Sequence, residues 1–283
     1  MKDDLVIVTG GAGFIGSHLC EKLVDEGFEV WSVDNYFTGS TDNHVEGVTY
    51  FDMEAKDIMK LLPAKPKYVF HLGEYSRVEQ SFDDIDIVWD YNTKGIQSVL
   101  KFCHRTGAKL IYAGSSTKFA DDGEGPTQSP YAFSKSTNTN LVNAYSKWFG
   151  IDYATVYFYN VFGGREIKSG PYATVVAKFK ELAKQGKEAS ITLPGTQLRN
   201  FTYIDDIVDG LIRVAYNGQG DEHGIGNPRS YTIVQLAELF GLKYQFTIAK
   251  KGNRMGAVVV GDKLDKLGWK PTVELEDYIK GVQ

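Results

Sequence analysis

The residues with the clearest chemical potential are Tyr131 and Lys135, which follow three consecutive hydroxyl residues at positions 115–117. On a helix, side chains four residues apart lie on one face, so the Lys135 ammonium can act on the Tyr131 phenol. The spacing alone has little specificity in a chain with 17 tyrosines. Its position matters more, because the pair follows an expected strand at 109–113, on the carboxyl-end side where doubly wound sheets bind ligands.

A glycine-rich turn near the N-terminus predicts a dinucleotide site. Gly10, Gly13 and Gly16 lie between an expected strand at 5–9 and an expected helix at 14–26. Such glycines allow a tight turn and a close approach to a pyrophosphate, and the free N–H groups at the helix start favour phosphate. Asp34 lies 18 residues after Gly16, at the end of the second expected strand. A carboxylate there accepts both adenosine-ribose hydroxyls and repels a 2′-phosphate, so we expect NAD rather than NADP.

The elements that position these residues alternate between strand and helix. Apolar runs of strand length at 5–9, 29–33, 68–72 and 109–113 are separated by helical patterns, which predicts a parallel sheet with helices on both faces. Two long helices are expected at 83–104 and 131–149, and shorter ones at 174–185, 205–216 and 232–240. We expect a Rossmann-type doubly wound α/β fold with an NAD-binding part at 1–162. Residues 163–283 should form mainly a smaller C-terminal substrate-binding cap, with about 190–216 returning to the first part.

Bulk composition excludes several classes of function. A net charge of -5 over 283 residues disfavours nucleic-acid binding. The first apolar run is too short for a signal peptide or a membrane span, so we expect a cytoplasmic protein. Cys20 and Cys103 fall within helical patterns without metal-ligand spacing, which predicts buried, reduced thiols and no metal.

Further motifs along nearly the whole chain resemble those of the extended short-chain dehydrogenase/reductase family, the sugar-nucleotide epimerases and dehydratases. Besides the glycine turn and Tyr-x-x-x-Lys, they are Asp34-Asn35 with Thr38-Gly39, Asp52, His71-Leu72-Gly73, Asn92-x-x-Gly95, Asn160-Val161-Phe162-Gly163, Arg199-Asn200-Phe201-x-Tyr203-Ile204-Asp205-Asp206 and Leu267-Gly268-Trp269-Lys270-Pro271. Together they are highly specific for the superfamily.

The resemblance implies that Tyr131 is the general acid/base for a sugar hydroxyl. Lys135 would hold the nicotinamide ribose and lower the pKa of Tyr131, and Ser115 would orient the substrate, with Ser116 as the alternative. A free phenol with a pKa of ~10 is only about one part in a thousand ionised at pH 7, so a shift of ~3 units would make it a competent base. Lys135 and the positive nicotinamide ring could supply that shift.

The resemblance also implies two sets of binding residues. NAD contacts are expected from Gly10, Gly13, Phe14, Ile15, Gly16, Asp34, Asn35, Thr38, Gly39, Asp52, Met53, Leu72, Gly73, Asn92, Tyr131 and Lys135. Contacts with the substrate, a nucleotide-diphosphate sugar, are expected from Ser76, Arg77, Ser115, Ser116, Asn160, Tyr172, Thr174, Arg199 and Arg254. Two departures from the family pattern are Ala257, where an acid usually follows the Arg254 motif, and Tyr157, where an arginine is usual.

The reaction favoured by these residues is 4-epimerisation. Sugar-nucleotide 4,6-dehydratases normally carry a Glu two residues after the catalytic Thr, and this chain has Thr117 there. Glu74 and Glu79 keep a different acid-dependent elimination open, although either is more often a solvated loop charge. A dehydratase and a 4-keto reductase are the enzymatic alternatives, and a catalytically silent NAD-binding sensor or scaffold is the non-enzymatic one. His71 is expected to anchor a strand end.

The expected helices at 83–104 and 131–149 resemble the pair through which this family dimerises as a four-helix bundle. We therefore expect a homodimer.

Overall fold

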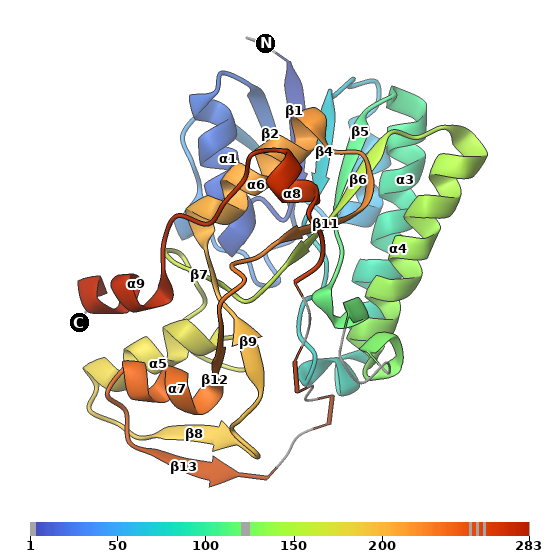
Figure 1. Ribbon diagram of the computed structural model, residues 1–283. Coiled ribbons are helices and arrows are strands. Elements are labelled where there is room, and N and C mark those ends of the chain that lie inside the picture. Colours follow the sequence, from blue (N-terminus) through green and yellow to red (C-terminus); the bar gives the residue numbers. More distant parts are fainter. Residues whose placement is uncertain (1–3, 120–124, 249–250, 253–254, 257–258, 283) are drawn as a thin grey trace.

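The core of the protein is a seven-stranded, fully parallel sheet (Figure 1). The computed structural model describes residues 4–119, 125–248, 251–252, 255–256 and 259–282. The strand order is β11-β6-β5-β4-β1-β2-β3, which confirms the predicted Rossmann-type α/β class. The strands are β1 (Leu5–Thr9), β2 (Glu29–Asp34), β3 (Val48–Asp52), β4 (Tyr68–His71), β5 (Lys109–Ala113), β6 (Tyr153–Phe158) and β11 (Gly220–Ile225).

Helices cover both faces of this sheet, as the alternating pattern predicted. In β1, Val6 and Val8 pack in one core and Ile7 in the other, because successive side chains point to opposite faces. The first core includes α1 (Phe14–Asp25) and α6 (Ile204–Asn217), and the second includes α3 (Gly95–Thr106) and α4 (Pro130–Phe149). The sheet is thus buried on both sides, and its ligand-binding edge lies at the carboxyl ends of the strands.

Helix α4 has clear start and stop signals in the sequence. The Ser129 hydroxyl accepts a hydrogen bond from the Ala132 N–H at 3.0 Å, and Pro130 occupies the first helical position. Gly150, with φ of 68°, ends the helix in the left-handed region. These caps fix where the turn carrying Tyr131 and Lys135 begins.

The long helix expected at 83–104 is present as a continuous helical run over residues 85–106, with a change of helix type inside it that was not predicted. The structure has α2 (Ile85–Val88), a π-helical turn at Trp89–Lys94, and then α3. Within the wide turn, the buried Asn92 amide bonds both backbone groups of Tyr75, with Oδ1 accepting from the N–H at 2.7 Å and Nδ2 donating to the carbonyl at 3.2 Å. This tertiary contact accounts for the local change in helix type.

A smaller lobe packs below the sheet in Figure 1 around its own apolar core. It contains α5 (Val175–Lys184), α7 (Ile233–Leu239), α9 (Leu275–Val282), β8 (Ala189–Thr192) paired with β13 (Tyr244–Thr247), and β9 (Leu198–Asn200) paired with β12 (Ser230–Thr232). The short strands β7 (Val161–Phe162) and β10 (Thr202–Tyr203) pair with each other.

The C-terminal part of the chain contributes to both lobes. Strand β11 is an edge strand of the main sheet, and α6 and α8 (Lys263–Lys266) pack against it. Strands β8 and β9 pair within the smaller lobe. The division at residues 162 and 163 stays a prediction. Cys20 and Cys103 are buried free thiols, as predicted. Across the described residues, no helix has the length and apolarity needed to cross a membrane.

Candidate functional site

A cavity of about 580 Å³ lies at the carboxyl ends of the strands and is lined by residues of both lobes. The glycine turn, the segment after β4, the segment after β5 and the start of α4 form one wall. Residues 172–176, Arg199 and Ile233 of the smaller lobe also line it. This is the position where open α/β sheets bind their ligands.

The glycine turn has the geometry that a pyrophosphate requires. Gly10 has φ of +77°, and a Cβ added there would lie 2.9 Å from the Gly73 backbone. A Cβ on Gly16 would lie 2.0 Å from the Gly10 carbonyl oxygen. Side chains at these positions would therefore push β1, α1 and the segment after β4 apart. The close backbone approach that these glycines permit fits a bound dinucleotide.

Asp34, at the end of β2, lines the cavity next to the glycine turn, where the adenosine ribose is expected. Its carboxylate accepts the Ala12 N–H and the Tyr36 N–H, both at 2.9 Å, which fixes its orientation. Burial raises the pKa of this carboxyl group. The other expected NAD contacts that line the cavity are Gly13, Phe14, Ile15, Asn35, Thr38, Gly39, Met53, Leu72 and Gly73.

Two expected NAD contacts lie elsewhere. Asp52 is exposed at the end of β3 and does not line the cavity. Asn92 is fully buried, and its amide holds the Tyr75 backbone and the Ser134 hydroxyl, the latter at 2.9 Å. The structure thus makes Asn92 a support for the segment after β4. Its position in the motif could not distinguish support from contact.

Ser115, Tyr131 and Lys135 line the same cavity, as expected of a catalytic set. The Ser115 hydroxyl accepts from the Thr117 hydroxyl at 2.9 Å and from the Thr117 N–H at 3.3 Å. Ser116 also lines the cavity, so both serine assignments stay open. The Lys135 ammonium donates to the Ala113 carbonyl at 2.5 Å, which anchors it beside the end of β5.

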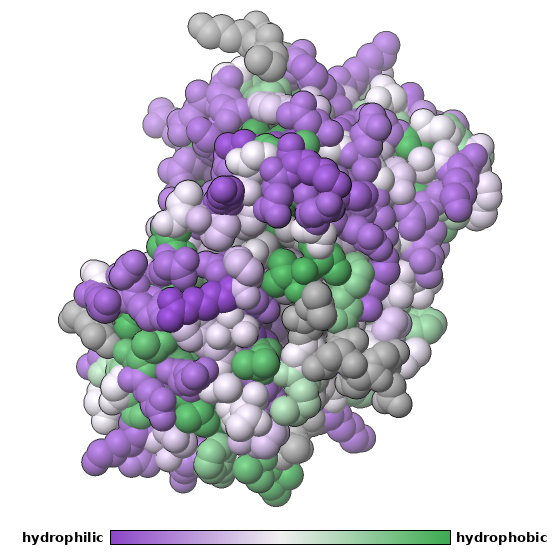
Figure 2. Space-filling view, viewed as in Figure 1, coloured by the Kyte–Doolittle hydropathy of each residue, from purple (hydrophilic) through white to green (hydrophobic). Residues whose placement is uncertain are grey.

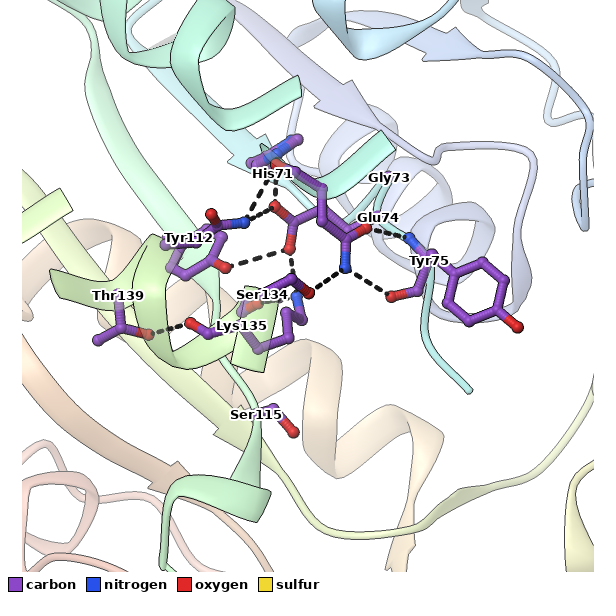
Figure 3. Close-up of polar contacts among 12 residues, drawn as sticks. His71, Gly73, Glu74, Tyr75, Tyr112, Ser115, Ser134, Lys135 and Thr139 are labelled. Carbon is purple, nitrogen blue, oxygen red and sulfur yellow. Dashed lines mark hydrogen bonds and ion pairs between the residues drawn. The ribbon is translucent and has the colours of Figure 1, made fainter. Parts of the chain in front are cut away.

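Glu74 is the main site residue that sequence reasoning misjudged. Its side chain is 1% exposed, and Oε2 lies 2.5 Å from the Lys135 Nζ (Figure 3). Asn138 Nδ2 donates to Oε1 at 3.0 Å, and the Tyr112 hydroxyl donates to Oε2 at 3.1 Å. The expectation of a solvated loop charge is therefore wrong. Burial alone would raise the pKa of Glu74, but Lys135 and His71 outweigh it and hold the pKa below its ordinary value.

His71 anchors the end of β4, as expected. The Thr9 hydroxyl accepts the Gly73 N–H at 3.0 Å and is hydrogen-bonded to His71 Nδ1 at 2.7 Å. On the other side of the ring, His71 Nε2 lies 3.4 Å from Glu74 Oε1.

The sugar end of the cavity brings together most of the expected substrate residues. Ser76, Arg77, Asn160, Tyr172, Thr174 and Arg199 all line it, whereas Arg254 lies outside the described residues. The Arg77 guanidinium donates to the Tyr172 carbonyl, which ties the segment after β4 to the smaller lobe. Asn160 has φ of 40°, and its amide donates to the Asn200 carbonyl at 2.8 Å.

Two carboxylates that the sequence did not single out hold this end in place. Asp84 accepts the hydroxyls of Tyr75 at 2.7 Å and Tyr172 at 2.8 Å. Glu166 is buried and accepts the Gly163 N–H at 2.9 Å and the Thr174 hydroxyl. Both residues stand in loops, where no periodic pattern indicates which side chains are buried.

The sheet order, the glycine turn and the fixed Asp34 carboxylate define a Rossmann-type dinucleotide-binding protein, and its Tyr-x-x-x-Lys pair lies in the same cavity. The sequence model of the NAD dependent epimerase/dehydratase family matches residues 6–233. The chain belongs to this family, which is enzymatic and uses NAD, as predicted.

Individual relatives agree with this assignment. UDP-glucuronic acid decarboxylase 6 of Arabidopsis thaliana is 30% identical over 96% of this chain and 85% of its own. The UDP-glucose 4-epimerase of Thermus thermophilus, solved with NAD, is 27% identical with a TM-score of 0.88, over 98% of this chain and 96% of its own. The UDP-glucose 4-epimerase of Thermotoga maritima, solved with UDP-glucose, is 28% identical with a TM-score of 0.90 over the same shares.

Proposed function

We propose that the protein is an NAD-dependent 4-epimerase of a nucleotide-diphosphate sugar, of the UDP-hexose type. The observation that carries the proposal is the shared cavity: Ser115, Tyr131 and Lys135 line the same space as the glycine turn and Asp34. Two arginines, Arg77 and Arg199, line its sugar end, and guanidinium forks suit a diphosphate or a sugar's oxygens.

In this proposal Tyr131 removes the proton from the C4 hydroxyl of the sugar, and Ser115 donates a hydrogen bond to the same oxygen. When bound, NAD supplies the hydride acceptor for oxidation at C4 and the hydride donor for the return step. Lys135, which lines the cavity, would hold the nicotinamide ribose of bound NAD. The 4-keto sugar turns over within the cavity, and Tyr131 returns the proton when the opposite face is reduced.

The site geometry disfavours 4,6-dehydration. Elimination needs an acid that faces C5 and C6 of the sugar, and residues 115–117 supply hydroxyls only. The Glu74 carboxylate is 1% exposed and occupied by Lys135, Asn138 and Tyr112. A carboxylate held in this way is a poor proton donor to a sugar.

A nucleotide-sugar decarboxylase is the second candidate, because the Arabidopsis decarboxylase is 30% identical over 96% of this chain. The same oxidation at C4 of a hexuronate places a ketone beside the carbon that bears the carboxylate. The resulting β-keto acid would lose CO₂ to leave an enolate, which would take a proton at C5 from water or a site acid before C4 is reduced again. The two reactions therefore share Tyr131, Lys135 and Ser115 and differ in the substituent at C5.

The deciding experiment is product NMR after incubation of the purified, NAD-supplied protein with UDP-glucose, UDP-N-acetylglucosamine, UDP-glucuronate and dTDP-glucose. We expect inversion at C4 with no change in mass for at least one UDP-hexose. Release of CO₂ from UDP-glucuronate alone would replace the proposal with the decarboxylase, and a stable 4-keto-6-deoxy product with the dehydratase. Stoichiometric consumption of NADPH would indicate a reductase. Tight NAD binding without turnover would indicate a silent sensor.

A further inference from the structure

The buried carboxylate of Glu74 lies directly against the lysine of the Tyr-x-x-x-Lys pair. Glu74 Oε2 and Lys135 Nζ are 2.5 Å apart, with side-chain exposures of 1% and 6%. The carboxylate comes from the segment after β4 and the ammonium from α4, so the pair joins two elements far apart in sequence (Figure 3). An ion pair this deeply buried has little solvent screening.

The other groups around this pair are two hydrogen-bond donors and one histidine. Asn138 from α4 and Tyr112 from β5 both donate hydrogen bonds to Glu74, and burial raises the pKa of Tyr112 well above its usual range, so the phenol stays neutral. His71 from β4 is 3.4 Å from Glu74 Oε1. Lys135 Nζ also lies 5.1 Å from the centre of the Tyr112 ring. The carboxylate and the ammonium, 2.5 Å apart, are thus the closest pair of opposite charges in this cluster.

One further cation lines the same cavity as Tyr131. Arg77 lines the cavity with Tyr131, and its hydrogen bonds go to neutral acceptors, the carbonyls of Tyr172 and Ser76 and the Ser76 hydroxyl. A positive charge that is paired with a neighbouring carboxylate acts weakly at a distance, whereas one bonded only to neutral acceptors keeps its field. Within the cavity, the charge of Arg77 is therefore less offset than that of Lys135.

We propose that Glu74 is a positioning residue: it fixes the Lys135 ammonium beneath the nicotinamide site and offsets its charge, so that Tyr131 ionises beside a nearly neutral ion pair. Glu74 and the Ala113 carbonyl take two of the three ammonium hydrogens, which leaves one directed to the cavity. This inference rests on the proposed role of Tyr131 as the acid/base. It adds that the lysine acts mainly by orientation, and that the phenol depends on Arg77 and bound cofactor for its ionisation.

The test is a direct titration of the Tyr131 phenol in the NAD-saturated protein. Tyrosine labelled with carbon-13 at the hydroxyl-bearing ring carbon gives one resonance per residue, and the one lost in Tyr131→Phe is that of Tyr131. In Glu74→Gln the shape of the side chain is kept and the negative charge is removed. We expect the pKa of Tyr131 to fall by about one unit, because the Lys135 charge is no longer offset.

A matched control separates charge from packing. Tyr112→Phe removes a hydrogen bond to Glu74 but no charge, so the pKa of Tyr131 should stay within about 0.3 units of wild type. If Glu74→Gln does not fold, Glu74→Ala serves in its place, since the smaller side chain leaves room for water around Lys135. An unchanged or raised Tyr131 pKa in the Glu74 variant would overturn the inference, as would an equal shift in Tyr112→Phe.

The titration needs no substrate. A protein that turns over no nucleotide sugar would therefore refute the proposed function while leaving this measurement informative.

Discussion

Tyr131 carries the chemistry at the scale of single residues. It lines the cavity one helical turn from Lys135 and on the same wall as Ser115. We predict that Tyr131→Phe lowers kcat for 4-epimerisation by ~100-fold or more, because general acid/base catalysis is lost while the aromatic ring still fills its place. Steady-state kinetics with a coupled assay for the product sugar measures this.

Tyr145→Phe provides the matched control, since it removes a phenolic hydroxyl from the same helix outside the cavity. Its rate should equal that of the wild type. Retention of NAD by both variants would show that the cofactor site is intact. Full activity in Tyr131→Phe would remove the assigned acid/base.

At the scale of elements, the ion pair between Glu74 and Lys135 connects the segment after β4 to α4. Glu74→Gln leaves a buried ammonium without its counter-charge, so we predict a loss of about 3 kcal/mol in the free energy of unfolding at pH 7. The folded-state pKa of Glu74 lies below its ordinary value of 4.5. The stability from this ionised carboxylate is therefore present above about pH 4.5 and lost as the pH falls through the folded pKa.

Urea unfolding of both proteins from pH 7 down to pH 3 measures this dependence. The difference between wild type and variant should shrink as the solution is acidified below about pH 4.5. The same unfolding measurement on Asp206→Asn serves as the comparison. Asp206 is also a buried carboxylate, and it accepts hydrogen bonds from Thr272 outside the cavity. A difference for Glu74→Gln that grows on acidification would contradict the account.

Local signals predicted most of the elements. The strands at 5–9 and 109–113 have the predicted bounds, and the helix expected at 131–149 begins one residue earlier at Pro130, because apolar periodicity and capping residues act within a few positions. The π-helical turn at Trp89–Lys94 was beyond such reasoning. It depends on hydrogen bonds from Asn92 to Tyr75, 17 residues away.

The residues of the candidate site likewise fall into a group that local motifs predict and a group that depends on long-range contacts. Motif residues such as Gly10, Asp34 and Tyr131 line the cavity because the order of strand, turn and helix places them there. The burial of Glu74 depends on Asn138 and Tyr112, which reach it from two other elements. A sequence pattern carries no direct record of such long-range contacts.

At the scale of the whole molecule, α4 exposes large apolar side chains on the face turned from the sheet. Phe133 is 50% exposed and Trp148 is 65% exposed. We predict that the protein is a homodimer through the helices about 83–104 and 131–149, which would cover this face. Light scattering after size exclusion should then give twice the chain mass of 31.5 kDa.

Phe133→Glu combined with Trp148→Glu should convert the dimer to a monomer, because a buried charge opposes association. Phe246→Glu is the matched control: this residue is also 50% exposed but lies on β13, at the lower end of the molecule where apolar side chains gather in Figure 2. Dissociation caused by Phe246→Glu and not by the α4 variant would place the interface elsewhere.

The central claim is that the sugar is oxidised at C4 and reduced again without leaving the cavity. The most direct measurement uses a UDP-hexose carrying deuterium at C4, incubated with the NAD-supplied protein in ordinary water and followed by NMR and mass spectrometry. We predict that the epimerised product keeps the deuterium at C4, because the hydride removed is the hydride returned. Product that has lost deuterium at C4 to solvent would contradict the account.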